Sequence, residues 1–148
     1  MAALRGAVGA ERVDNQYRGG CLCGRLRWEA EGEPLYQGYC CCADCRRASG
    51  SGFVAFMGFA GAEVRFSGEA RQFRSASFRG GEAVRNFCGD CGGLVFGGEA
   101  GVDRSHTVYA GSLDEPSLFR PTLAIFTRER PAWVVLPPGL QEWETMPG

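Results

Sequence analysis

The chain has 148 residues and a mass of 16.0 kDa, enough for one domain with a hydrophobic core but too few for several. Its 16 basic and 17 acidic residues give a net charge of -1, so no long-range field would draw it onto nucleic acid or an anionic membrane. Every basic residue is arginine, which excludes lysine Schiff bases, and the single histidine, His106, excludes a multi-histidine metal site.

Eight cysteines are the most unusual feature of the composition. They could form disulfides in an oxidising compartment or bind metal in a reducing one. Arginine and acidic residues interrupt the first 20 residues, which therefore lack the apolar stretch of about 7–15 residues found in a secretory signal. No segment approaches the roughly 20 apolar residues of a membrane span. We therefore expect a cytoplasmic protein with reduced thiols and no membrane partner.

The 23 glycines divide the chain into short segments and make long helices improbable. The segments carry strand patterns, which predict an all-β domain of many short antiparallel strands. In chain order the expected strands are Leu22–Glu29, Phe53–Phe59, Glu63–Phe66, Ala83–Phe87, Leu94–Phe96, Thr107–Ala110, Leu123–Phe126 and Trp133–Leu136. One helical turn is expected at Ala43–Ser49, where Gly50 ends it. Residues 1–16 are expected to form a flexible tail and residues 17–148 a single domain.

Two cysteine pairs far apart in the sequence have spacings suited to one closed metal site. Cys21 and Cys23 would point to the same side of an extended strand while Leu22 faces the core. Cys88 and Cys91 lie in a glycine-rich turn with the form of a zinc knuckle. Four thiolates around one ion leave no position for a substrate, so this site would be structural. Buried reduced thiols are the alternative.

The middle cysteines suggest a second site of a different kind. In an extended segment Cys40 and Cys42 share a face and Cys41 points away, and Cys45 returns through the first turn of the short helix. Three thiolates with a vacant fourth position are typical of a catalytic zinc. The helix N-terminus and the guanidinium groups of Arg46 and Arg47 would favour thiolates there. A closed site using all four cysteines and a Cys42–Cys45 redox pair stay open as alternatives.

At these residues the sequence resembles the glutathione-dependent formaldehyde-activating enzymes, a family that also contains the centromere protein V type. The resemblance extends from about Tyr17 to Trp143 and is most specific in the cysteine motifs. The matching elements are Gly20–Gly24, Cys40–Gly50, Phe87–Gly92, Gly111–Asp114, Ile125–Phe126 and Pro131–Trp133. One departure is Cys41, which stands where the family usually has histidine.

The resemblance implies a β-tent type fold organised by two zinc ions per chain. It assigns Cys21, Cys23, Cys88 and Cys91 to a structural zinc, and Cys40, Cys42 and Cys45 to a catalytic one. The implied reaction is that of a carbon–sulfur lyase, which condenses a small thiol, possibly glutathione, with a small aldehyde such as formaldehyde.

The chemistry expected of an open three-cysteine zinc site agrees with that reaction. The ion lowers the pKa of a substrate thiol, which can then attack a carbonyl carbon as thiolate. Arg46, as a catalytic residue, and Arg47 could hold a substrate carboxylate or balance the charge of the site. Two other classes of function remain: a protein-binding module stabilised by both zinc ions, and a thiol redox enzyme.

Overall fold

The structure, a computed structural model, describes residues 16–147. The flexible tail expected at residues 1–16 therefore lies outside the described residues except for Gln16, which begins the first described strand. In the described part of the chain, no helix has both the length and the apolar character needed to cross a bilayer.

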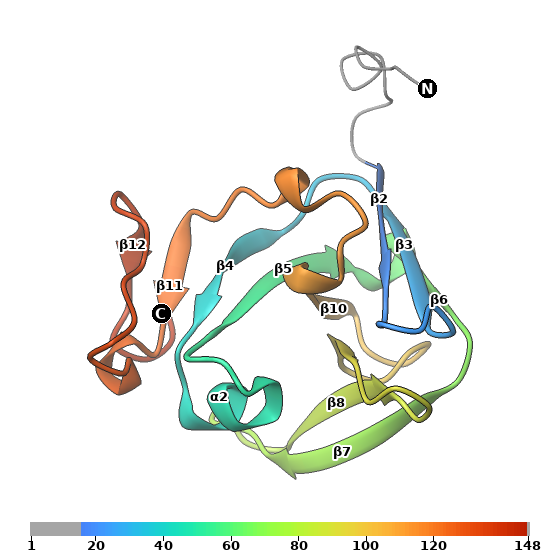
Figure 1. Ribbon diagram of the computed structural model, residues 1–148, viewed down its shortest axis with the longest axis horizontal. Coiled ribbons are helices and arrows are strands. Elements are labelled where there is room, and N and C mark those ends of the chain that lie inside the picture. Colours follow the sequence, from blue (N-terminus) through green and yellow to red (C-terminus); the bar gives the residue numbers. More distant parts are fainter. Residues whose placement is uncertain (1–15, 148) are drawn as a thin grey trace.

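The strands of the described chain form two β-sheets (Figure 1). The larger sheet has the spatial order β12 (Gln141–Glu142), β11 (Leu123–Ile125), β4 (Tyr36–Cys40), β5 (Val54–Ala60), β10 (Ser105–Tyr109), β9 (Leu94–Gly97), β8 (Glu82–Cys88) and β7 (Ala70–Ala76). The smaller sheet has the order β2 (Gln16–Gly20), β3 (Arg27–Glu31) and β6 (Val64–Ser67). The helical elements are α2 (Ala43–Ser49) and the 3-10 turns η1 (Gly61–Glu63), η2 (Ala110–Ser112), η3 (Pro116–Leu118) and η4 (Thr127–Glu129). The expected all-β class is confirmed.

Successive side chains of the central strands point to opposite faces of the large sheet. Met57 and Phe59 of β5 and Val108 of β10 point into the main core, where they pack with Trp28 of the small sheet. The ring nitrogen of Trp28 donates a hydrogen bond of 2.9 Å to Ser112 Oγ. The intervening residues of the same strands face the opposite side, which leaves that side of the sheet free to line a cavity.

The helix expected at Ala43–Ser49 is present with the same bounds, and Gly50 ends it at φ 73°. The strands expected around Phe53–Phe59, Glu63–Phe66, Ala83–Phe87, Leu94–Phe96, Thr107–Ala110 and Leu123–Phe126 are also present, with ends shifted by up to two residues. The exclusively antiparallel arrangement is wrong at one end of the sheet, because β11 pairs in parallel with β4 and with β12.

The strand expected at Trp133–Leu136 is absent from the structure, although buried and exposed side chains do alternate along the segment. Val134 and Leu136 are buried, whereas Trp133 and Val135 are exposed. Prolines at positions 131, 137 and 138 flank the segment and lack the N–H groups that a sheet ladder needs. The segment therefore packs its apolar side chains without pairing as a strand.

His106 is a buried, hydrogen-bonded residue of the main core. Its Nδ1 lies 3.0 Å from the carbonyl oxygen of Gly97, and its ring meets Phe66 edge-on at 5.1 Å between centroids. These contacts hold the imidazole within the fold.

Candidate functional site

The sulfur atoms of Cys21, Cys23, Cys88 and Cys91, called here the four-cysteine cluster, lie within 4.8 Å of one another. Cys23 Sγ is 3.7 Å from Cys21 Sγ and 3.6 Å from Cys88 Sγ. Four thiolates at about 2.3 Å from a zinc ion in tetrahedral geometry would be roughly 3.8 Å apart. The donor set and its spacing therefore fit a zinc ion.

Two tight turns build the four-cysteine cluster. The β2–β3 turn closes through a hydrogen bond of 3.1 Å from the Gly24 N–H to the Cys21 carbonyl, with Gly24 at φ 84°. The expected extended strand is therefore wrong here, and Leu22 is 89% exposed instead of facing the core. Glycine at a left-handed position lets the chain reverse within the turn, so both thiols converge without a strand.

Backbone N–H groups also point at these sulfurs. Leu26 N–H donates to Cys21 Sγ at 3.3 Å, and Asp90 N–H donates to Cys88 Sγ at 3.4 Å. Desolvation opposes ionisation of Cys21, but the Leu26 hydrogen bond and the neighbouring thiols lower its pKa to about 6. The turns thus stabilise thiolate, the form that binds metal.

The sulfur atoms of Cys40, Cys42 and Cys45, the three-cysteine cluster, also lie within 4.8 Å of one another. Cys40 ends β4, and Cys42 is the N-cap of α2, with its Sγ accepting the Cys45 N–H at 3.3 Å. Cys41 is fully buried on the other side of the chain, where it packs with Ala124 and Val134. The expected divergence of Cys41 from its neighbours is confirmed.

One negative charge is shared within the three-cysteine cluster when no cation neutralises it. Hydrogen bonds from the thiols of Cys40 and Cys45 lower the pKa of Cys42 to about 2. The bond to Cys42 raises the pKa of Cys40 far above its usual range. For Cys45 a hydrogen bond from Cys40 favours the thiolate, but the bond to Cys42 and burial together raise the pKa to about 11. A cation that takes up all three thiolates would remove this competition, and three soft sulfur donors suit zinc.

The three-cysteine cluster opens into a cavity of about 870 Å³. All three cysteines line it, whereas no member of the four-cysteine cluster does. Its floor is the face of the large sheet opposite the core, and includes Tyr36, Phe56, Thr107 and Tyr109. Its volume is in the range of small-molecule sites. The cavity therefore gives the three-cysteine cluster access to a ligand, whereas the four-cysteine cluster lies outside it.

Arg85 of β8 is the cationic residue that the cavity brings to the three-cysteine cluster. Its Nη2 lies 3.9 Å from Cys45 Sγ, and its Nη1 donates to Ser75 Oγ at 3.2 Å. Burial opposes the charge of Arg85, but Tyr109 and Cys45 outweigh burial and raise its pKa. Arg46, the catalytic arginine expected from the sequence, and Arg47 are not among the residues that line the cavity.

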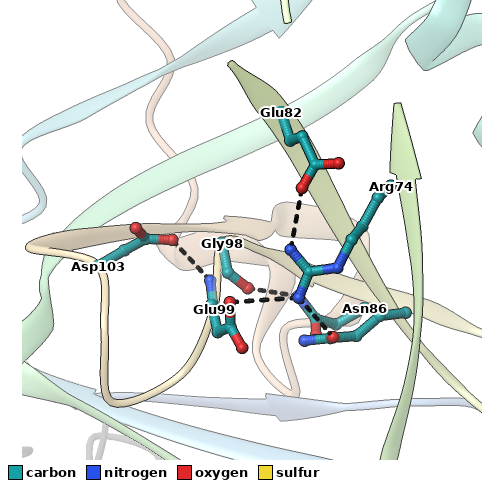
Figure 2. A network of polar contacts seen from close by, with 7 residues as sticks. Arg74, Glu82, Asn86, Gly98, Glu99 and Asp103 are labelled. Atoms are coloured by element: carbon teal, nitrogen blue, oxygen red, sulfur yellow. Dashed lines mark hydrogen bonds and ion pairs between the residues drawn. The ribbon is translucent and has the colours of Figure 1, made fainter. Parts of the chain in front are cut away.

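Part of the cavity rim is fixed by polar contacts among β7, β8 and the loop after β9 (Figure 2). Arg74 pairs with Glu82 and with Glu99, each at 3.2 Å. Asn86 donates to the Gly98 carbonyl at 2.7 Å, and Asp103 accepts the Glu99 N–H at 2.6 Å. Because Glu82, Gly98 and Asp103 also line the cavity, this network holds an acidic wall in place.

Comparison with known proteins agrees with this architecture. The model of a family described as glutathione-dependent formaldehyde-activating enzyme matches residues 16–129. A crystal structure of a Rhodobacter sphaeroides protein superposes with a TM-score of 0.52 and 18% identity, covering 85% of this chain and 98% of that one. That similarity concerns the fold alone. No curated protein matches the chain significantly.

Proposed function

Since this chain belongs to the glutathione-dependent formaldehyde-activating enzyme family, we propose that it is a zinc-dependent carbon–sulfur lyase. It would join a small thiol such as glutathione to a small aldehyde such as formaldehyde. The observation that carries the proposal is the cavity, which reaches the three-cysteine cluster and not the four-cysteine cluster. A purely structural pair of metal sites would not require such an opening.

In this proposal each cysteine cluster holds one zinc ion. Cys21, Cys23, Cys88 and Cys91 would supply four ligands to a structural ion, and Cys40, Cys42 and Cys45 three ligands to a catalytic one. Zinc bound by three cysteines lowers the pKa of a thiol that completes its coordination, so the thiol reacts as thiolate. Cys41 lies outside this chemistry, because it is buried away from the cavity.

The protein's own residues would orient the thiol and hold its charged groups. Arg79 lines the cavity and can bind a carboxylate, while Glu82 and Asp103 can bind an ammonium group. Glutathione carries groups of both kinds. The apolar part of the lining, including Phe56 and Ile125, would limit water around the reacting carbon. We place the protein in the cytoplasm, where its free thiols would stay reduced.

The proposal is tested by NMR exchange between glutathione and its formaldehyde adduct, with zinc-loaded protein. We expect exchange faster than in buffer, and loss of the acceleration in Cys45→Ser. Cys41→Ser is the matched control, because it alters a neighbouring thiol outside the cavity. Wild-type protein with two zinc ions and no acceleration would contradict the proposed reaction.

A second measurement separates catalysis from the alternative of a metal-stabilised binding module. Cobalt replaces zinc and reports thiolate coordination through its absorption. We expect an added thiol to change the spectrum of cobalt in the three-cysteine cluster, and a cluster with complete coordination would not respond.

A further inference from the structure

Arg85 presents unused hydrogen-bond donors to the cavity beside the three-cysteine cluster. Its Nη1 donates to Ser75 Oγ and its Nη2 faces Cys45 Sγ, but its buried Nε has no hydrogen-bond partner among the described residues. A guanidinium has five N–H donors, and leaving a buried donor unpaired is costly. Each of the two Nη nitrogens carries a second N–H beyond these contacts, and a ligand oxygen in the cavity can accept a hydrogen bond from it.

Tyr109 brings a second donor to the same part of the cavity. It lies on β10, which pairs with β9, and Gly97 of β9 is paired with Arg85 of β8 in the sheet register. Because Gly97 has no side chain, the Tyr109 hydroxyl extends over β9: a Cβ atom at Gly97 would be 3.8 Å from it. Tyr109 and Arg85 both line the cavity, and Tyr109 packs against the hydrophobic cluster that contains Cys40, as Cys42 and Cys45 do.

These two groups lie beside the three-cysteine cluster. The separation of 3.9 Å between Arg85 Nη2 and Cys45 Sγ resembles the spacing between sulfurs in the four-cysteine cluster. An oxygen two bonds away from a sulfur held next to Cys45 is therefore within reach of Arg85. A substrate carboxylate of glutathione, which is many bonds from its sulfur, is better suited to the rim.

We propose that Arg85 and Tyr109 form an oxyanion-binding pair that holds the aldehyde oxygen during attack by the thiolate. In this step the carbon–sulfur bond forms and the π electron pair of the carbonyl moves to oxygen. The proton that the thiol lost to solvent on ionisation is replaced at oxygen by one from water. Donors positioned for the developing charge stabilise the transition state more than the reactants. This inference rests on the proposed function and assigns two catalytic residues to it.

The first test measures condensation of formaldehyde with ethanethiol, a thiol without a carboxylate. We expect Arg85→Gln to lower kcat/KM by about 100-fold, Tyr109→Phe by about tenfold, and Arg85→Lys to restore part of the loss. Arg71→Gln on β7 and Tyr39→Phe on β4 are matched controls, since neither residue lines the cavity. Cooperative melting and two bound zinc ions in each variant verify the fold. An Arg85 effect seen only with glutathione would overturn the proposal, because it would indicate binding of a carboxylate.

The second test measures binding and needs no turnover. Thioacetate carries a partly negative oxygen two bonds from sulfur, whereas ethanethiol has none, and both are titrated against the cobalt-substituted protein. We expect Arg85→Gln and Tyr109→Phe to weaken thioacetate binding by about tenfold and ethanethiol binding by less than about twofold. Equal weakening of both probes would overturn the proposal in favour of an effect on the metal site. A wild-type protein that shows the thioacetate preference without accelerating condensation would contradict the proposed function alone.

Discussion

The ring of Phe78, at the turn between β7 and β8, meets the ring of Phe126 edge-on with 5.0 Å between centroids. The two residues come from opposite sides of the cavity, and both line it. Phe126 follows β11 and has φ 55°, the only positive φ outside glycine in the described chain. The contact therefore joins, at the cavity, segments that follow strands near opposite ends of the large sheet.

Replacing Phe78 by alanine is expected to change substrate retention more than stability. The side chain is 62% exposed, so the loss of folding free energy should be about 1 kcal/mol or less. We expect KM for glutathione to rise severalfold with a smaller change in kcat. Phe73→Ala is the matched control, because Phe73 is 61% exposed on β7 and does not line the cavity. Equal KM values in the two variants would show that the contact does not retain substrate.

A carboxylate holds the start of α2 and hence the position of two cysteines. Glu129 Oε1 accepts a hydrogen bond of 2.9 Å from the N–H of Ala43, the first residue of α2. We expect Glu129→Ala to cost about 1 kcal/mol in the free energy of unfolding, as for loss of a helix cap. Amide exchange in α2 should also become faster. Glu69→Ala, at an exposed position between β6 and β7, serves as the control. If amide exchange in α2 became equally fast in this variant, a specific role of Glu129 would be excluded.

The cysteine clusters were predictable from sequence because their geometry is largely local. Cys88 and Cys91 share one turn, and Cys42 and Cys45 share the first turn of α2, whose end Gly50 also marks. Each of the two distant cysteine pairs offers two thiolates, and a closed zinc site needs four ligands, so the sequence also indicated that the two pairs share one ion. The turn that exposes Leu22 could not be predicted, because the apolar residues Leu22, Leu26 and Trp28 alternate with polar residues as they would in a longer strand.

Arg85 was missed for a different reason. It approaches Cys45 from 40 positions later in the chain, a contact that depends on the register of β8 and not on local spacing. A signal was present: Arg85 is a charged residue within the strand pattern Ala83–Phe87, as expected for a side chain that faces a cavity and not the core. β7 was missed because it lies at the sheet edge and has mostly exposed side chains, which give no apolar alternation.

Removing ligands from the two clusters should have different consequences. A structural zinc contributes its binding free energy to folding, on the order of 10 kcal/mol in small zinc domains. We expect Cys88→Ser, which changes a buried thiol of the four-cysteine cluster, to abolish cooperative melting. Cys45→Ser should retain cooperative melting and carry one zinc ion instead of two. Native mass spectrometry counts the ions, and equal metal loss and unfolding in both variants would contradict the division into structural and catalytic sites.

Alkylation should identify Cys42 as the ionised thiol once a mild chelator has emptied the three-cysteine cluster. Its pKa of about 2 means that it is thiolate throughout pH 5–8, because a lowered pKa extends the charged form toward acid. We expect its iodoacetamide reaction rate to be almost independent of pH in this range, whereas an ordinary thiol slows about tenfold per unit of acidification. Cys41, which is buried, should remain unmodified in the folded protein. Peptide mass spectrometry assigns each rate, and a tenfold decrease per pH unit at Cys42 would contradict charge sharing by Cys40 and Cys45.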